Sequence, residues 1–253
     1  AQFIATTMYG QVVNQVVPVS STSAAEAVKL MENIFRSVNI ALVNEIKVIY
    51  SMMDIDIWEV IGAAKTKPFG FMPFYPGPGL GGHCIPIDPF YLTWKARESD
   101  IPTRFIELAG EINSAMPVHT IRCVADALND HAGKAIKGAK ILVIGAAYKK
   151  NIDDMRESPS LRIMELLIQK GASVSYYDPY VPEIIETRLH PDLAGMKSVD
   201  WSMDNLSQYD VALVCTDHDS VDWQELVSNV PLVVDTRNAT QDVVQHRDRI
   251  VKA

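Results

Sequence analysis

The sequence of 253 residues is short of cysteine, of long apolar runs and of positive charge. Its three cysteines, Cys84, Cys123 and Cys215, are odd in number and have no paired spacing, so we expect a reducing compartment, the cytoplasm, and no disulfide framework. No other Cys or His lies at ligand spacing from His83 and Cys84, so no metal is expected. The lack of a membrane-spanning run and the net charge of −8 argue against a membrane or nucleic acid as partner.

Glycine and proline are concentrated in residues 68–89, PFGFMPFYPGPGLGGHCIPIDP, which contain five of the 13 glycines and six of the 14 prolines. This composition predicts a stiff, shaped loop that presents Cys84. The alternative interpretation is that Cys84 is a small, buried hydrophobic residue. A nucleophilic thiolate is favoured, because Gly81 and Gly82 can bring bare backbone amides close to it.

Residues 23–132 are predicted to be helical apart from that loop. Ser23 and Glu26 have capping-box spacing and open a helix to about residue 53, with an apolar face. Asp56 begins a second helix, and Asp88 followed by Pro89 has the order of an N-cap and first helical residue. A further helix follows residue 101, and Pro117 starts or kinks the next. Residues 3–19 indicate a short helix and then a strand-like segment with nothing obvious to pack on.

After Gly138 short apolar runs alternate with helical patterns. Strands are predicted at AKILVIG, ASVSYYD, DVALVCT and PLVVD, and helices at residues 159–170, 182–190 and 223–229, the first capped by Ser158. Regular alternation of this kind predicts a doubly wound parallel sheet. The expected fold class is therefore α/β, with an all-helical central domain followed by a Rossmann-like C-terminal domain.

Three polar residues, a pair on one helix and a single aspartate, are candidates to assist the thiol. Lys29 and Asn33 are four residues apart on one helical face, which is either solvated or buried under the loop, where they would supply a cation and an oxyanion donor. Asp88, four residues after Cys84, is a helix cap that could also hold water or a base.

The first strand of the α/β region ends in GAAYKKNIDDMRESPS, without a GxGxxG fingerprint. Lys149 and the helix start at Ser158 still offer what a phosphate group needs, unless the lysine pair is simply solvated. Arg237 follows the last predicted strand, and the carboxyl ends of parallel strands converge on one crevice.

Three blocks in order, VKLMENIFRSVNIALVNE, GPGLGGHCIPIDP and GAAYKKNIDDMRESPS, resemble the UDP-glucose/GDP-mannose dehydrogenase family. The loop form FMPFYPGPGLGGHCIPIDPFYL is most similar to the UDP-N-acetylglucosamine 6-dehydrogenase branch. The resemblance implies oxidation of the C6 alcohol of a UDP-sugar, a UDP-N-acetylhexosamine, to a carboxylate with two NAD⁺. It implies a homodimer formed through the helix of residues 23–53.

Carried over by motif, the resemblance assigns Cys84 as the nucleophile that forms a thiohemiacetal and then a thioester. Lys29 and Asn33 match the pair that stabilises oxyanions, and Asp88 matches the aspartate that assists water. Lys149 and Arg237 resemble residues near the substrate and cofactor. The residues implied to line the sugar-nucleotide pocket are Phe74, Tyr75, Gly79, Gly81 and Gly82.

The resemblance also suggests three segments: residues 1–21 as the tail of an NAD-binding domain, 22–117 as the central dimerisation and cysteine domain, and 118–253 as the UDP-sugar-binding domain. On this reading the chain is a fragment, since members of the family begin with a complete Rossmann domain. The alternative is that the chain as given is a catalytically inactive dimerisation and UDP-nucleotide-binding module. A thiol hydrolase is less consistent with the sequence, because no His/Asn partner arrangement is evident.

Overall fold

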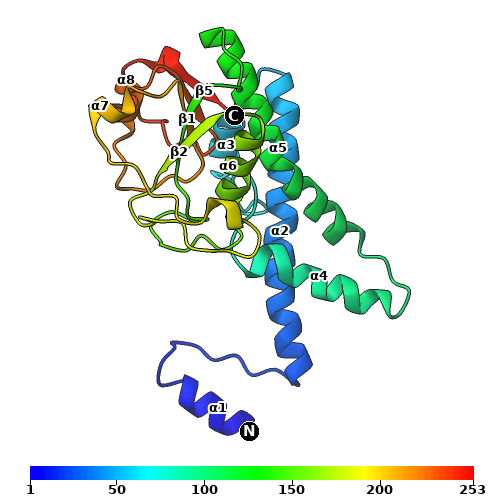
Figure 1. The fold of residues 1–253 in the computed structure, drawn as a ribbon. Coiled ribbons are helices and arrows are strands. Elements are labelled where there is room, and N and C mark those ends of the chain that lie inside the picture. Colours follow the sequence, from blue (N-terminus) through cyan, green and yellow to red (C-terminus); the bar gives the residue numbers. More distant parts are fainter.

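The computed structural model describes residues 1–253 and consists of a helical part followed by an α/β part (Figure 1). The helical part contains α1 (Gln2–Tyr9), α2 (Thr22–Met52), α3 (Ile57–Ala64), α4 (Cys84–Arg97) and α5 (Arg104–Ala132). The α/β part contains β1 (Lys140–Ile144), α6 (Pro159–Gln169), β2 (Ser173–Tyr177), η1 (Pro191–Leu193), α7 (Met203–Leu206), β3 (Val211–Val214), α8 (Trp223–Asn229), β4 (Val233–Asp235), η2 (Arg247–Arg249) and β5 (Ile250–Lys252). The predicted fold class is confirmed.

The sheet has the strand order β2-β1-β3-β4-β5, and every neighbouring pair is parallel. Ile144 at the end of β1 lies opposite Tyr177 of β2 and Val214 of β3, so these strands end at nearly the same level. The chain passes to one side of β1 to form β2 and to the other side to form β3. The switch point of a doubly wound sheet therefore lies between β1 and β3.

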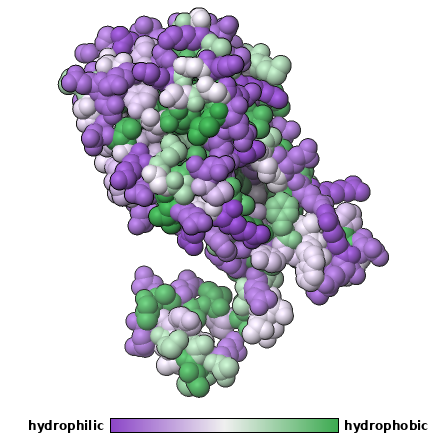
Figure 2. Space-filling view, in the orientation of Figure 1, coloured by the Kyte–Doolittle hydropathy of each residue, from purple (hydrophilic) through white to green (hydrophobic).

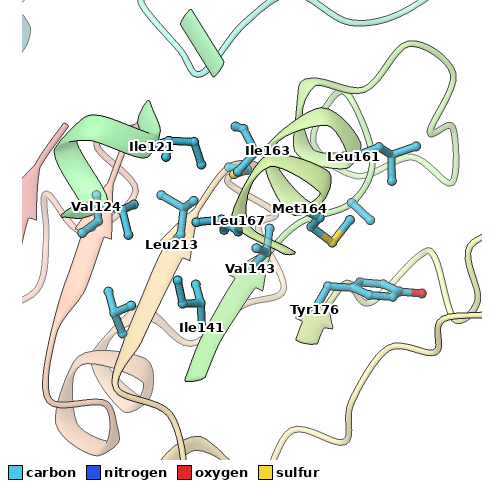
Figure 3. Close-up of a cluster of buried hydrophobic side chains, with 14 of the residues drawn as sticks. Ile121, Val124, Ile141, Val143, Leu161, Ile163, Met164, Leu167, Tyr176 and Leu213 are labelled. Carbon is cyan, nitrogen blue, oxygen red and sulfur yellow. The ribbon is translucent and has the colours of Figure 1, made fainter. Parts of the chain in front are cut away.

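Alternate residues of each strand pack against helices on opposite faces of this sheet. On one face Val143 and Leu213 contact Ile163 and Leu167 of α6 and Val124 of α5 (Figure 3). The other face packs beneath α7 and α8, with a core of Leu142, Ile144, Leu206, Ala212, Val214, Leu226, Val227 and Val233. Because both faces are covered, the strands read as continuous apolar runs, as the sequence predicted.

The long helix α2 lies beside α5 and is contacted by α4 (Figure 1). Its enclosed face is polar or small, while the apolar face predicted from periodicity is exposed in the single chain. The enclosed residues are Asn33, Ser37, Ala41, Asn44 and Lys47. The exposed apolar residues are Val28, Met31, Phe35, Leu42 and Ile49. No helix of the chain has both the length and the apolar character needed to cross a membrane.

Two predicted helix starts are wrong. α2 is capped by Ser21, whose side chain accepts a hydrogen bond from the Ala24 N–H, and not by Ser23. α4 begins at Cys84 and not after Asp88, so Asp88 is an interior residue and Pro89 lies inside the helix. An earlier start is possible because Pro86 falls in the first turn, where a missing N–H leaves no intrahelical bond unmade.

The remaining helical segments also differ in detail. α5 is one helix that runs through Pro117, because its flanking turns pack on α2 and α6. The boundary placed between residues 117 and 118 therefore falls inside α5. Residues 182–190 are not helical: Ile184 exchanges backbone hydrogen bonds with Gly195 and Met196, and this pairing replaces the helical ladder.

The first 21 residues contribute nothing to the core. α1 has no buried residue, and the strand-like segment before Ser21 has no strand to pair with and is not a strand. Figure 2 shows hydrophobic residues on the surface of this detached segment. The expectation that it lacks a packing surface in this chain is confirmed.

Candidate functional site

Cys84 is the first residue of α4, at the end of the glycine-rich loop, and its side chain is exposed. At this position it lies at the amide-rich N-terminal end of the helix, where the first backbone N–H groups have no intrahelical partner. The alternative of a buried, inert cysteine is therefore wrong. The Arg156 guanidinium is a nearby cation: its pKa is raised, mainly by the Asp154 carboxylate and to a smaller extent by Cys84.

Asn33 and Asp88 meet, as the expectation of a shared site required. The Asn33 Nδ2 donates a hydrogen bond of 2.8 Å to Asp88 Oδ2, although 55 residues separate them. Asn33 Oδ1 accepts a bond of 3.0 Å from Arg36 Nη1, so the amide is held from both ends. Asp88 and Cys84 are four residues apart in α4 and therefore lie on one helical face.

Lys29 does not join this group. Its side chain is 58% exposed, and its ammonium contacts Glu32 Oε2 at 3.4 Å. It lies one turn before Asn33, beyond the part of α2 that is enclosed. A cation role for Lys29 therefore stays a prediction, and within this chain Arg156 is the cation with an electrostatic effect involving Cys84.

The glycines of the loop fit it against the α/β part. A Cβ at Gly81 would lie 2.5 Å from the Tyr148 Cβ and 2.9 Å from the Glu157 carbonyl oxygen. Gly82 has a φ of +82° and donates its N–H to the Arg156 carbonyl at 3.0 Å. The predicted bare amide of Gly82 is thus already used. Gly79, with a φ of +148°, lies against Pro159 and Pro117.

Phe74 and Tyr75 point to different surroundings. Phe74 packs edge-on against Phe35 of α2, with ring centroids 5.5 Å apart. Tyr75 stacks on Trp58 of α3 at 5.9 Å, with the ring planes inclined by 13°. Only Tyr75 lines the large cleft beside the sheet, so the structure separates two residues that the sequence grouped in one pocket.

This cleft has a volume of about 500 Å³ and lies between α3, the loop and the carboxyl edge of the sheet. Arg237 contributes its guanidinium, which donates from Nε to Asp217 Oδ1 at 3.1 Å and from Nη1 to the Pro76 carbonyl at 3.4 Å. The Asp235 carboxylate accepts from the Arg237 N–H and fixes the turn. Arg237 therefore joins the two parts of the chain. The charged residues of the cleft are of both signs: Lys65, Lys150 and Arg237 with Asp217, Asp219 and Asp242.

Lys149 is exposed and does not line the cleft; its neighbour Lys150 does. Lys150 Nζ contacts Asp219 Oδ1 at 2.9 Å, and the Asn151 side chain donates to Asp219 Oδ2 at 2.6 Å. The loop after β1 is thus held to the loop after β3. The roles expected for Lys149 and Arg237 toward substrate and cofactor stay predictions.

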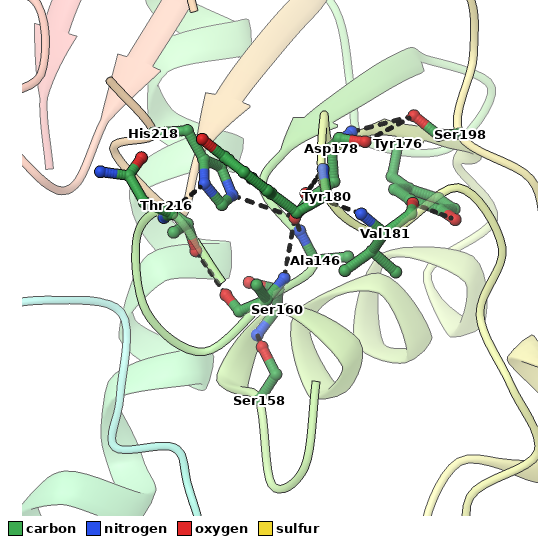
Figure 4. A network of polar contacts seen from close by, with 12 residues as sticks. Ala146, Ser158, Ser160, Tyr176, Asp178, Tyr180, Val181, Ser198, Thr216 and His218 are labelled. Carbon is green, nitrogen blue, oxygen red and sulfur yellow. Dashed lines mark hydrogen bonds and ion pairs between the residues drawn. The ribbon is translucent and has the colours of Figure 1, made fainter. Parts of the chain in front are cut away.

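A buried carboxylate occupies the switch point of the sheet (Figure 4). Asp178 Oδ2 accepts hydrogen bonds from the Ala146 and Ala147 N–H groups at 2.7 and 2.9 Å. His218 Nδ1 accepts from the Asn151 N–H, which leaves Nε2 to donate to Asp178 at 3.1 Å. Burial opposes the charge on Asp178, but these donors outweigh it and lower the Asp178 pKa.

The comparisons with known proteins match both parts of the chain. The profile described as "UDP-glucose/GDP-mannose dehydrogenase family, central domain" matches residues 23–115, and that of its UDP binding domain matches residues 142–242. Together they cover more than half of the chain. The chain belongs to the UDP-glucose/GDP-mannose dehydrogenase family. The family consists of NAD-dependent UDP-sugar dehydrogenases, as the resemblance implied.

Individual relatives agree with the family. A UDP-N-acetyl-D-mannosamine dehydrogenase of Methanococcus maripaludis is 36% identical over 84% of this chain and 45% of its own length. An NDP-N-acetyl-D-galactosaminuronic acid dehydrogenase of Ralstonia nicotianae is 33% identical over 87% and 49%. The solved structure of a UDP-D-ManNAc dehydrogenase from Pyrococcus horikoshii superposes with a TM-score of 0.81 and 31% identity, over 96% of this chain and 55% of that one.

The chain thus spans about half the length of the relatives it matches. Two of their names carry N-acetylmannosamine and the third an N-acetylgalactosaminuronic acid, in line with the N-acetylated sugar class expected from the loop. None of the three is named for N-acetylglucosamine, so that branch stays a prediction.

The residues of this chain do not fit NAD at the place where a Rossmann sheet usually holds it. The amides of the first strand-to-helix turn bind a pyrophosphate in that mode. Here Ala146 and Ala147 donate to Asp178 instead, and the carboxylate takes the position of the anion. The sequence lacks a GxGxxG fingerprint after β1, and in the structure the backbone amides of this turn bind Asp178.

Several contributors to the site were missed from sequence. Trp58 and Asp217 line the cleft, and Asp178 fixes the turn after β1. Asp217 and Asp178 carried a readable signal, since each follows a strand of a parallel sheet. Trp58 had no such signal, because only the folded loop brings Tyr75 against it.

Proposed function

We propose that this chain provides the thiol and the nucleotide-binding cleft of a nucleotide-sugar 6-dehydrogenase that acts on a UDP-N-acetylhexosamine. The observation that carries the proposal is the joining of Cys84, at the amide-rich start of α4, to Asp88 and Asn33, while the same loop carries Tyr75 into the cleft of Arg237. The uridine diphosphate lies in that cleft, where Arg237 and Lys150 offset its charge.

In the proposed reaction Cys84 Sγ adds to the C6 aldehyde of the sugar, forming a C–S bond, and the aldehyde oxygen takes up a proton. The thiohemiacetal keeps the aldehyde from leaving before its second oxidation. After that oxidation a water molecule held by Asp88 attacks the thioester, the C–S bond breaks, and the carboxylate is released with the thiol restored. Both oxidations require a hydride acceptor, and in this family the acceptor is NAD. The residues of this chain do not form the usual NAD site, because Ala146 and Ala147 donate to Asp178.

Two features of the protein follow. The exposed apolar face of α2 has heptad-like spacing over Val28, Phe35, Leu42 and Ile49, and we propose that it forms a homodimer with a second copy. A free thiol as nucleophile requires a reducing compartment, so we place the protein in the cytoplasm.

The proposal is tested by alkylation and calorimetry. We expect iodoacetamide to modify Cys84 before Cys123 and Cys215, and UDP-N-acetylglucosamine or UDP-N-acetylmannosamine to slow that modification. The substitution Arg237→Ala should weaken UDP binding by at least about tenfold, since a charge-assisted contact is removed. Arg188→Ala, at an exposed arginine away from the cleft, is the matched control. No heat with UDP, or equal loss in both variants, would contradict the proposal.

A second candidate function applies to the 253-residue polypeptide taken alone. The occupied switch point favours a module that binds UDP and assembles but does not oxidise. We therefore expect the isolated chain to bind UDP without forming uronate when NAD⁺ and a UDP-sugar are supplied. Uronate formation by this polypeptide, followed by mass spectrometry, would refute that role.

A further inference from the structure

A second cavity, of about 330 Å³, lies behind the nucleotide cleft, between the helical part and the end of the sheet. Lys47 of α2, Trp58 of α3, and His119 and Cys123 of α5 line it. It opens to the surface beside Asp54. Trp58 lines both hollows, so one indole side chain separates this cavity from the cleft of Tyr75 and Arg237.

The Lys47 ammonium in this cavity has no partner. The residue is 5% exposed, and its Nζ makes no hydrogen bond within the chain. Cys123 and Asp235 act on it only electrostatically, and the Asp235 carboxylate accepts its hydrogen bonds from the Arg237 N–H and from the N–H and hydroxyl of Thr240. A buried charge without a partner is costly, and burial lowers the Lys47 pKa to about 8. A bound anion would remove that cost.

The other charges around the cavity limit the ligand to a single negative charge. Lys252 is paired with Asp56, which also caps α3 through the Trp58 N–H. Asp54 adds a carboxylate at the mouth and disfavours a dianion. His119 lies near Lys47 and Arg122, and burial together with these cations lowers its pKa. Of the two lysines in the lining, Lys47 is therefore the one whose ammonium makes no hydrogen bond or ion pair.

Apart from Ser51, the rest of the lining is largely apolar. Ile55, Ile57, Trp58 and Ala253 line the cavity together with Lys47, and Cys123 is half-buried there with a pKa raised by its burial. A phosphate has no apolar part that could cover this apolar surface. We propose that the cavity binds a small monocarboxylate with an apolar body, its carboxylate on Lys47 and its body against Trp58, at a site distinct from the proposed nucleotide site.

Benzoate is the probe for this site, with uncharged benzamide as the matched compound. We expect benzoate to bind the 253-residue chain in a calorimetric or ligand-observed NMR titration, and benzamide to bind at least about tenfold more weakly, because only the carboxylate pairs with Lys47. The substitution Lys47→Met, which keeps an unbranched stem, should weaken benzoate by a similar factor. Lys67→Met, at an exposed lysine that lines neither hollow, should leave it unchanged.

The relation to the nucleotide cleft is tested in the same titration. Benzoate affinity should stay within about twofold when UDP is saturating, since the two ligands occupy different hollows. Displacement of benzoate by UDP would overturn the proposal and place the probe in the cleft. Equal binding of benzamide and benzoate would also overturn it. So would the absence of benzoate binding to the wild-type chain, which would mean that water alone solvates Lys47. If Lys47→Met fails to fold, the benzamide comparison still decides.

Discussion

The two parts of this chain have opposite interiors. The sheet buries aliphatic side chains on both faces, including Ile141 and Val143, which are fully enclosed. The enclosed face of α2 carries Asn33, Asn44 and Lys47, while its apolar residues are exposed. The α/β part is thus stabilised by hydrophobic burial, whereas the interior of the helical part is organised by hydrogen bonds that hold the thiol-bearing loop.

The hydrogen bonds in the helical interior connect elements that are distant in sequence. Asn44 Nδ2 donates to Asn113 Oδ1 at 3.0 Å, and Asn44 Oδ1 accepts from the Gly77 N–H at 3.0 Å. Asn113 Nδ2 in turn donates to the Ser37 carbonyl at 3.1 Å. One pair of amides therefore ties α2 to α5 and the loop to α2. Buried polar groups destabilise the fold little when all of them are hydrogen-bonded, but removing one partner lowers the free energy of unfolding substantially.

The largest effect is expected in the aliphatic core. Ile163→Ala in α6 removes a fully buried side chain that contacts the sheet, and should lower the free energy of unfolding by about 2–5 kcal/mol. Ile168→Ala, at an exposed position of the same helix, is the control and should change it by under about 0.5 kcal/mol. Chemical denaturation followed by circular dichroism measures both. Equal losses would show that the α/β core is not the dominant source of stability.

A smaller and pH-dependent effect is expected at the switch point. Asp178→Asn removes the charge that four backbone N–H groups and His218 stabilise, and should cost about 1–3 kcal/mol at pH 7. Because the folded-state pKa of Asp178 is lowered, its stabilisation is present above the ordinary pKa of about 4 and is lost as pH falls through the lowered value.

The gap in unfolding free energy between wild type and Asp178→Asn should therefore narrow below about pH 4. Asp200→Asn, at an exposed aspartate, is the matched control. A gap that is constant from pH 7 to pH 3 would mean that the charge of Asp178 does not stabilise the turn.

In the helical interior, Asn44→Ala should cost about 1–2 kcal/mol, since the Gly77 N–H and the Asn113 amide lose their partner. The same variant should weaken UDP binding, because Gly77 lies against Arg237, where a Cβ would come within 2.6 Å of Nη1. Asn129→Ala, exposed near the end of α5, provides the comparison. Calorimetry with UDP separates the two effects: unchanged affinity in Asn44→Ala would show that the amide pair stabilises the helices without positioning the loop.

The smallest effect on the stability of the single chain is expected on the exposed face of α2. Leu42→Gln should change the unfolding free energy of the monomer by less than about 0.5 kcal/mol, yet weaken self-association. Sedimentation velocity over a concentration series measures the association, with Ile185→Gln, exposed in the α/β part, as control. A monomeric wild-type chain, or equal association of both variants, would contradict the proposed dimer.

The same contrast explains what could be predicted from sequence. The strands β1, β3 and β4 are short apolar runs, and Ser158 and Pro159 mark the start of α6, so the α/β part was readable. In α2 the apolar periodicity correctly predicted a helix, but periodicity cannot distinguish packing within the chain from a surface left for a partner. The predicted start of α4 was wrong because Asp88 followed by Pro89 has the order of an N-cap and first helical residue. Pro86 in the first turn is a weaker signal of a helix start.

Within the candidate site, adjacency in sequence or a shared helical turn did not decide which residues come together: Lys29 and Asn33 share a turn of α2, yet only Asn33 contacts Asp88. Asp88 and Cys84 share α4, and the contact of Asp88 with Asn33 agreed with the expected grouping. Phe74 and Tyr75 are neighbours in the loop, and yet Phe74 packs against α2 whereas Tyr75 stacks on Trp58 and lines the cleft. The roles of Trp58 and Arg156 depend on contacts made only in the folded chain.

The close fit at Gly81 limits how this loop can change. The atoms that a side chain at position 81 would meet are a Cβ, a backbone carbonyl and a proline ring, none of which moves aside without shifting the main chain. A smaller residue at position 148 would therefore not compensate for a larger one at position 81. Substitutions that alter ligand binding are therefore expected at other positions of the loop, such as Tyr75, which lines the cleft.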